Sequence, residues 1–129
     1  MNKRYSLVVI MILLSLLLGG CSLMTDQSTE KQEMIQIAES QKMKVAIESY
    51  LKNLDPEALT PNGKIKSYRI LKDKLKYNPM EGIIVEIVIN RDDRLTIDMT
   101  VIEKDSGEYL VATSGTPKEL TKLIERDKQ

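Results

Sequence analysis

Residues 82–101 read GIIVEIVINRDDRLTIDMTV, two apolar runs separated by a short polar turn. In each run an apolar residue recurs at every second position, which is the repeat of a strand with one buried face. The residues concerned are Ile83, Val85, Ile87 and Ile89 in the first run, and Leu95, Ile97, Met99 and Val101 in the second. Because strands joined by a short turn pair antiparallel, this stretch predicts a β-hairpin with one apolar face.

Flanking segments extend this hairpin into a larger sheet. Residues 65–71 and 75–77 predict a long, irregular extended stretch that ends at Asn78-Pro79. After the hairpin, Asp105-Ser106-Gly107 predicts a turn that leads into another strand over residues 108–113. Short turns make consecutive strands antiparallel neighbours, so the sequence predicts a meander of three to four strands.

Two helices are predicted outside the sheet. Apolar residues spaced by three and four positions predict an amphipathic helix over residues 42–54. The helical pattern begins near Glu30, but its early apolar residues point to nearly the opposite side. The helix therefore either kinks near Ser40 or contacts something different in its early part. Near the C-terminus, residues 116–119 (TPKE) predict a capping box that opens a short helix.

The predicted fold class is therefore α+β. An N-terminal amphipathic helix packs on the antiparallel meander, and a short C-terminal helix follows. Ile87 and Met99 lie on the apolar phase of their strands and are expected to face the helix, whereas Thr100 faces away. The arrangement is similar to that of cystatin-type folds, an analogy that carries no function.

The N-terminus predicts export and lipid attachment. Lys3 and Arg4 precede an almost unbroken apolar run over residues 7–18, which is the layout of a secretory signal. The sequence Leu18-Gly19-Gly20-Cys21 then resembles the lipobox of bacterial lipoproteins. An uncleaved membrane anchor is the alternative, but the apolar run is shorter than the about 20 residues that a spanning helix needs.

Cleavage at this site would divide the chain into three parts. They are a lipoprotein signal peptide (1–20), a flexible tether (21–29) and a single α+β domain (30–129). Cys21 would carry the lipid, so we expect the protein to be anchored at the extracytoplasmic face of the cell membrane. The precursor has 19 basic and 19 acidic residues, and loss of Lys3 and Arg4 leaves an acidic excess. No nucleic-acid partner is therefore expected.

The residue types present argue against an enzyme. The chain has no histidine, and its single cysteine, Cys21, is the expected site of lipid attachment. The commonest general base and a thiol nucleophile are therefore both missing. The alternative is a small hydrolase of the cell envelope that uses a carboxylate pair, or a Ser–Lys pair with Ser67 or Ser114 as nucleophile.

Neither a metal nor a cofactor is predicted. Asp92 and Asp93, with Asp98 nearby, could offer oxygen ligands to calcium. Calcium sites, however, gather six to eight oxygens within a defined loop. Two adjacent acids at a hairpin tip are better explained as a solvated turn.

Basic residues gather between positions 64 and 77. The side chains that could contact an anionic surface are Lys64, Lys66, Lys72, Lys74 and Lys76. One interpretation is a patch for anionic lipid headgroups or wall polymers. The other is protection of an exposed strand edge, because lysines discourage pairing with another edge. Strand alternation would bring these lysines to one side only if the strand ran unbroken from the first to the last.

Three segments resemble a family of small exported proteins from Gram-positive bacteria, catalogued as domain of unknown function 1310. They are residues 51–60 (LKNLDPEALT), 63–68 (GKIKSY) and 78–85 (NPMEGIIV). At Glu81 the family pattern leads us to expect a second glycine. The resemblance implies a Gram-positive cell surface, and it implies no established activity and no functional residue.

These observations together predict a non-enzymatic lipoprotein. Its domain would bind an unknown protein or an envelope component, or serve as an accessory or immunity-like subunit.

Overall fold

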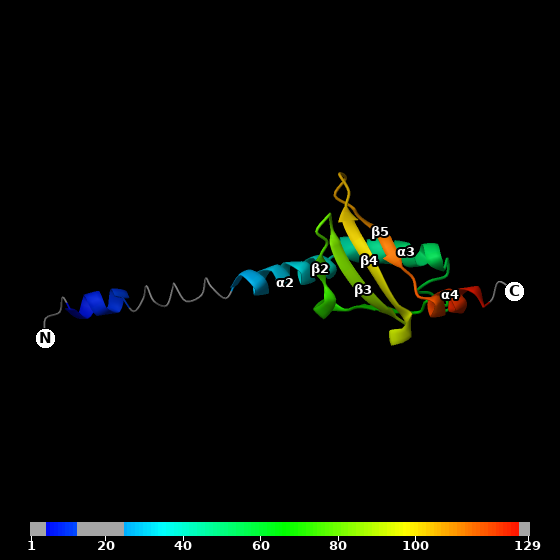
Figure 1. Cartoon of the computed structure of the whole chain (residues 1–129), viewed down its shortest axis with the longest axis horizontal. Helices are drawn as coiled ribbons and strands as arrows, with labels where there is room; N and C mark the ends of the chain where they lie inside the picture. The colour runs from blue at the N-terminus through cyan, green and yellow to red at the C-terminus, as the bar shows by residue number, and fades with distance from the viewer. Residues whose placement is uncertain (1–4, 13–24, 127–129) are drawn as a thin grey trace. The chain divides into compact units, whose positions relative to one another are not determined.

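The predicted hairpin lies in the interior of the sheet in the computed structural model, which describes residues 5–12 and 25–126 (Figure 1). Its strands are β3 (Ile83–Ile89) and β4 (Thr96–Glu103), which pair antiparallel. The register places Val85 opposite Met99 and Ile87 opposite Ile97, so these side chains share one face. All four are almost fully buried, which confirms that Ile87 and Met99 face the core.

The sheet has five strands, one more than the upper limit that the sequence predicts. Strand β5 (Tyr109–Gly115) pairs with β4, while β1 (Tyr68–Ile70) and β2 (Lys76–Tyr77) both pair with β3. The extra strand arises because a 3₁₀ turn over Lys72–Lys74 (η1) interrupts the extended stretch. The two short strands therefore lie end to end along one edge of β3, and β5 forms the opposite edge.

The helical region consists of two helices and not one kinked helix. Helix α2 spans Thr25–Ala38 and α3 spans Gln41–Leu54. Ser40 separates them in an extended conformation and caps α3, because its hydroxyl oxygen accepts a hydrogen bond from the Met43 N–H at 3.2 Å. The break between the two helices lets Met34 and Ala38 of α2 and the later apolar stripe of α3 be buried in the same core. Helix α2 begins within the segment 21–29 that the sequence predicts as a tether.

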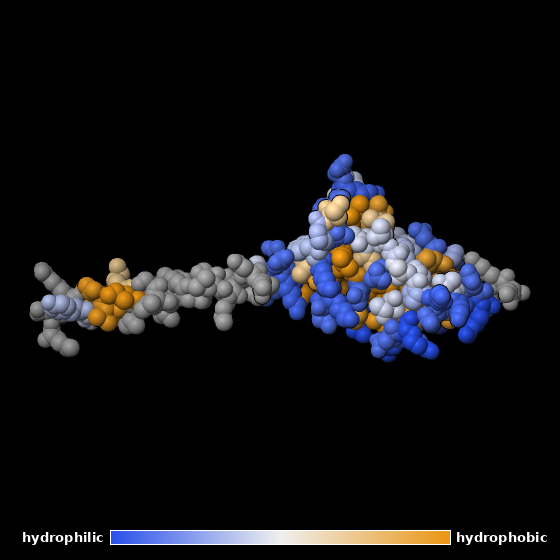
Figure 2. Space-filling view, viewed as in Figure 1, coloured by the Kyte–Doolittle hydropathy of each residue, from blue (hydrophilic) through white to orange (hydrophobic). Residues whose placement is uncertain are grey.

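The core lies between α3 and one face of the sheet. Helix α3 contributes Met43, Ala46, Ile47 and Leu51, all buried. The short C-terminal helix α4 (Lys118–Glu125) adds Leu120, which is fully buried. Val88, on the opposite phase of β3, is also buried, so the second face of the sheet is covered at that point. Figure 2, which has the same orientation as Figure 1, shows hydrophobic and hydrophilic residues mixed over the visible surface.

The predicted capping box at the start of α4 is wrong. Pro117 occupies the N-cap position, and no side chain there accepts a capping hydrogen bond. The Pro117 carbonyl instead accepts the first helical bonds, from Leu120 and Thr121. The Thr116 hydroxyl has a tertiary partner, the Tyr50 hydroxyl at 3.1 Å, so it is not available to the helix.

One buried carboxylate closes the loop that follows α3. Asp55 is the C-cap residue of this helix and is only 7% exposed. Its Oδ2 atom accepts hydrogen bonds from the N–H groups of Lys64 at 2.7 Å and Ile65 at 3.0 Å, and its Oδ1 accepts one from Glu57 at 3.2 Å. Asp55 thereby joins the end of α3 to the segment that enters β1.

Asn90 holds the same segment from the other side. Its side-chain oxygen accepts hydrogen bonds from Lys66 N–H at 2.7 Å and Ser67 N–H at 3.2 Å. Its amide nitrogen donates to the Lys64 carbonyl at 2.8 Å. Asn90 has φ 54°, a left-handed conformation that asparagine tolerates better than most residues. Residues 64–67 are therefore fixed by two side chains from different parts of the chain.

The chain divides into two units, Met1–Glu33 and Met34–Gln129. Residues 5–12 of the first unit are helical. Within the part of the chain that the structure describes, no helix is both long enough and apolar enough to cross a membrane. The lipobox and Cys21 lie outside the described residues.

Candidate functional site

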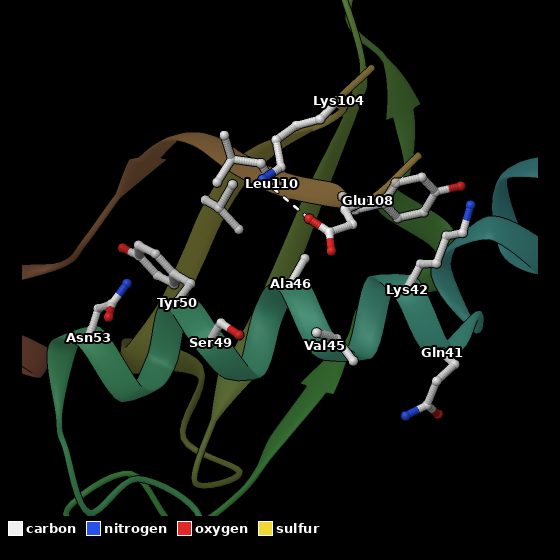
Figure 3. A pocket seen from close by; sticks show the side chains of 12 residues that line it. Gln41, Lys42, Val45, Ala46, Ser49, Tyr50, Asn53, Lys104, Glu108 and Leu110 are labelled. Carbon is white, nitrogen blue, oxygen red and sulfur yellow. Dashed lines mark ion pairs between the residues drawn. The ribbon is translucent and has the colours of Figure 1, made fainter. Parts of the chain in front are cut away.

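A groove of about 500 Å³ runs between α3 and the edge strand β5 (Figure 3). Helix α3 forms one wall and β5, with the turn before it, forms the other. The residues lining it are Gln41, Lys42, Val45, Ala46, Ser49, Tyr50, Asn53, Lys104, Glu108, Tyr109, Leu110 and Val111. A groove of this size could accommodate several amino-acid side chains.

The helical wall of the groove carries a row of uncharged residues. Gln41, Val45, Ser49 and Asn53 are spaced by four positions, so they lie along one side of the helix. The adjacent row is charged and consists of Lys44, Glu48 and Lys52, of which the two lysines are exposed and Glu48 is half-buried. Val45 is 54% exposed. Burial of an apolar side chain such as this one is favourable, so contact with another molecule here would be stabilising.

The part of the other wall that β5 forms is also uncharged. β5 reads YLVATSG and contains no ionisable group except the Tyr109 phenol. Leu110 is 45% exposed, and Tyr109 and Val111 pack partly against the core. Both walls of the groove therefore combine backbone with small or apolar side chains.

Charged residues at one end of the groove are paired with one another. The Lys104 ammonium lies 3.3 Å from the Glu108 carboxylate, as the dashed line in Figure 3 marks. The Lys42 ammonium lies 3.9 Å from Glu103 and 5.5 Å from the centroid of the Tyr109 ring. At this distance the ring face attracts the cation weakly. These pairings leave the groove without a strong net charge at that end.

Hydroxyl groups close the other end of the groove. The Tyr50 hydroxyl donates a hydrogen bond to Ser114 Oγ at 2.7 Å and lies 3.1 Å from Thr116 Oγ1. These contacts connect α3 to the C-terminal end of β5. The partner of Ser114 is therefore a phenol and not the lysine that a Ser–Lys hydrolase needs.

The other predicted serine also has no lysine as a base partner in the structure. Ser67 is exposed, and its N–H donates to Asn90. Among the described residues Asp55 is the one buried charged side chain, so no buried lysine lies near either serine. As for a carboxylate pair, Glu86 and Asp98 are direct cross-strand neighbours, but Asp98 is exposed and Glu86 lies 3.9 Å from Lys74.

The predicted lysine cluster does not lie on a continuous strand. The η1 turn falls at Lys72–Lys74, so alternation cannot gather the lysines on one side. Lys72 pairs with Glu39 of the preceding helical region, and Lys74 lies 3.9 Å from Glu86 on β3. Lys66 donates to the Pro61 carbonyl at 3.3 Å. Lys64 and Lys76 lie on opposite sides of this turn in the sequence, and Lys76 is in the edge strand β2.

The acidic hairpin tip binds its own arginine. Asp92 accepts hydrogen bonds from Arg94 Nε at 3.1 Å, Nη2 at 2.8 Å and the Arg94 N–H at 3.0 Å. These bonds from the side chain and backbone of Arg94 lower the pKa of the Asp92 carboxyl. In the described ranges no three acidic, cysteine or histidine side chains group as a metal site would require.

A further titratable contact lies beside α3. Burial raises the pKa of the Tyr68 phenol, and the Glu48 carboxylate, which accepts its hydrogen bond, raises it further. The protonated phenol thus joins β1 to α3, a structural contact outside the groove.

Comparison with known proteins identifies the family. Residues 5–123 match the family described as "Protein of unknown function (DUF1310)". The chain belongs to the DUF1310 family. No curated protein and no solved structure matches the chain. The family membership predicted from three sequence segments is therefore confirmed, and the description of the DUF1310 family assigns no activity.

The segments that resemble DUF1310 proteins stabilise the fold and lie mostly outside the groove. Residues 51–60 supply Asp55, and residues 63–68 supply the backbone groups that this carboxylate and Asn90 hold. In residues 78–85 the Asn78 side chain accepts a hydrogen bond from Met80 N–H at 2.9 Å, which forms the turn between β2 and β3. Gly82 has φ 85°, so a glycine is needed there. Glu81 has no positive φ, and a second glycine is not required.

The sequence contained a signal for the groove that our sequence interpretation missed. The four-residue spacing of Gln41, Val45, Ser49 and Asn53 marks an uncharged row on a helix that carries three lysines and one glutamate at other positions. Residues 109–116 likewise form a stretch without any Asp, Glu, Lys or Arg. What the sequence does not contain is the placement of these two features side by side.

Proposed function

We propose that this DUF1310 protein is a non-enzymatic, lipid-anchored module at the outer face of the cytoplasmic membrane, and that it binds a polypeptide along the groove between α3 and β5. The lipobox supports the anchor and the location. Support for a binding role comes from the groove of about 500 Å³, whose walls are mostly uncharged and whose charged lining residues, Lys42, Lys104 and Glu108, lie in ion pairs. Its residue types also favour binding over catalysis, because Ser49 and Ser114 have neither histidine nor buried lysine beside them.

The observation that carries this proposal is the uncharged row on α3, with Val45 exposed in it, beside the edge strand β5. Val45 and Leu110 remain about half exposed on the two walls of one groove. Apolar side chains exposed on two walls of one groove offer a bound molecule apolar contact on both sides. A strand edge offers backbone hydrogen bonds, and an adjacent groove offers space for alternate side chains, which together suit an extended polypeptide.

Replacing Cys21 by Ala is expected to abolish lipid attachment completely. The thiol is the acceptor of the lipid, and alanine offers no nucleophile in its place. The precursor should then stay uncleaved and should lose the acyl chains that hold a mature lipoprotein at the membrane. Mass spectrometry of the mature N-terminus checks this result, with Ser22→Ala as the matched control that should be processed normally. An unmodified Cys21, or cleavage at another site in the unchanged chain, would contradict the proposed anchor.

A photo-reactive residue at Val45 is expected to cross-link to a polypeptide in intact cells. Val45 lies in the groove and is half exposed, so a larger side chain there can reach a bound partner. Lys44 is the matched control because it is exposed on the same helix but does not line the groove. The cross-linked product should be visible on a denaturing gel and should disappear after protease treatment. Equal cross-linking at both positions, or none at Val45, would refute the binding role of the groove.

A further inference from the structure

The two edges of the sheet differ in a way that indicates how each is used. The edge formed by β1 and β2 is divided into strands of three and two residues. It carries Arg69 and Lys76 on these strands, and Lys72 and Lys74 on the turn between them. Short, interrupted edges with lysines are the usual protection against pairing with another chain. This edge therefore resists strand addition.

The β5 edge lacks this protection. It is seven residues long, has no lysine, arginine, proline or acidic residue, and pairs with β4 alone among the described strands. Its one edge-blunting feature is a bulge-like register shift that leaves Ala112 without a partner residue in β4, and the strand continues on both sides of it. An uncharged edge of this length presents a row of backbone N–H and C=O groups to which another strand can be added.

The charge distribution favours a second copy of the chain as the occupant. In a two-fold pairing, each surface meets its own copy, so any cluster of like charges would repel itself. Both β5 and the α3 row of Gln41, Val45, Ser49 and Asn53 are uncharged, so they can face their own copies without this cost. The protected opposite edge also matters. Because it cannot accept a strand, edge pairing of copies must stop at two and cannot continue into a fibre.

We propose that β5 pairs antiparallel with β5 of a second copy, which also covers the groove along α3 in each copy. This inference rests on the proposed function, since it names the polypeptide that occupies the groove. The middle residue of β5 is Ala112, so the two-fold axis passes close to it. The two copies would then share one continuous sheet, with both α3 helices on the same face.

The oligomeric state of the full-length chain in detergent tests the proposal. Light scattering, corrected for detergent, should give the mass of two copies for the unchanged chain and for Ala112→Val. Ala112→Lys places like charges near the axis and should halve that mass. All three chains carry the same anchor, so copies that merely share a micelle would give two copies in every case, and that result would overturn the proposal. A single copy for the unchanged chain would do so as well.

Cysteine cross-linking in membranes decides the case in which Ala112→Lys fails to fold. In full-length chains with Ala112→Cys or Thr113→Cys, at least one should form a disulfide-linked dimer, because both positions lie near the axis. Lys76→Cys on the protected edge and Asp105→Cys beyond the end of β5 should not form one. The unchanged chain, whose one cysteine is Cys21, provides the background. Absence of a dimer with both central cysteines would overturn the proposal. If the photo-reactive Val45 chain then cross-links to a different protein, the proposed function stands and only the second copy is refuted.

Discussion

Replacing Ile87 by Ala is expected to lower the free energy of unfolding by about 2–5 kcal/mol. Ile87 is fully buried in the middle of β3, opposite Ile70 on one side and Ile97 on the other. Removal of its side chain leaves a cavity between two neighbours that the sheet holds in place, so the surroundings can collapse only in part. Urea denaturation followed by circular dichroism measures the change.

Thr100→Ala is the control for the Ile87 variant. Thr100 lies on the opposite phase of β4, across from Ile84, and both side chains are partly exposed. Thr100→Ala should therefore change the free energy of unfolding by no more than about 0.5 kcal/mol. Equal losses at Ile87 and Thr100 would mean that both faces of the sheet are covered, and the two-layer architecture would be wrong.

Replacing Asp55 by Ala is expected to destabilise the chain by a similar amount, about 2–5 kcal/mol. The variant leaves the N–H groups of Lys64 and Ile65 without their acceptor, and an unsatisfied buried donor costs about 1–3 kcal/mol. It also separates the end of α3 from the segment before β1. Thermal and urea unfolding of the variant give the size of the loss.

Two matched variants isolate the contribution of the Asp55 carboxylate. Asp55→Asn keeps the shape of the side chain and one acceptor oxygen. It should therefore lower the free energy of unfolding by less than Asp55→Ala does. Asp105→Ala removes an exposed carboxylate in the turn before β5 and should change stability by no more than about 0.5 kcal/mol. If Asp55→Ala were as mild as Asp105→Ala, water would be replacing the carboxylate, and the loop closure described above would be incorrect.

Much of the fold could be predicted because it depends on local repeats. Alternation over residues 82–101 correctly predicts β3, β4 and their buried face, and the spacing of Met43, Ile47 and Leu51 correctly predicts α3. These patterns are reliable because each element must bury one side, and the period of a strand or helix determines which residues lie on that side. The family could also be predicted, because three segments of the chain resemble it and the family model matches residues 5–123.

Other features could not be predicted because a partner distant in sequence determines them. The Thr116 hydroxyl could cap α4, yet it lies beside Tyr50, 66 residues away in the sequence. The lysine-rich segment between positions 64 and 76 is compatible with one long strand or with two short ones. In the structure it forms two, β1 and β2, which both pair with β3 and are separated by the turn that begins at Lys72. In each case the local sequence permits two arrangements, and tertiary contacts select one.

The sequence by itself determined the α+β class, the central hairpin and the amphipathic helix, whereas the export signal with Cys21 as its lipid acceptor stays a prediction. Only the tertiary structure decided that α2 and α3 are separate helices, that β5 and the β1–β2 pair form the two edges, and that the uncharged row on α3 lies beside β5. The physical reason is the range of the interactions. Periodicity along the chain reports which face of an element is buried, whereas strand order, exposed edges and grooves follow from how elements far apart in the chain share one core.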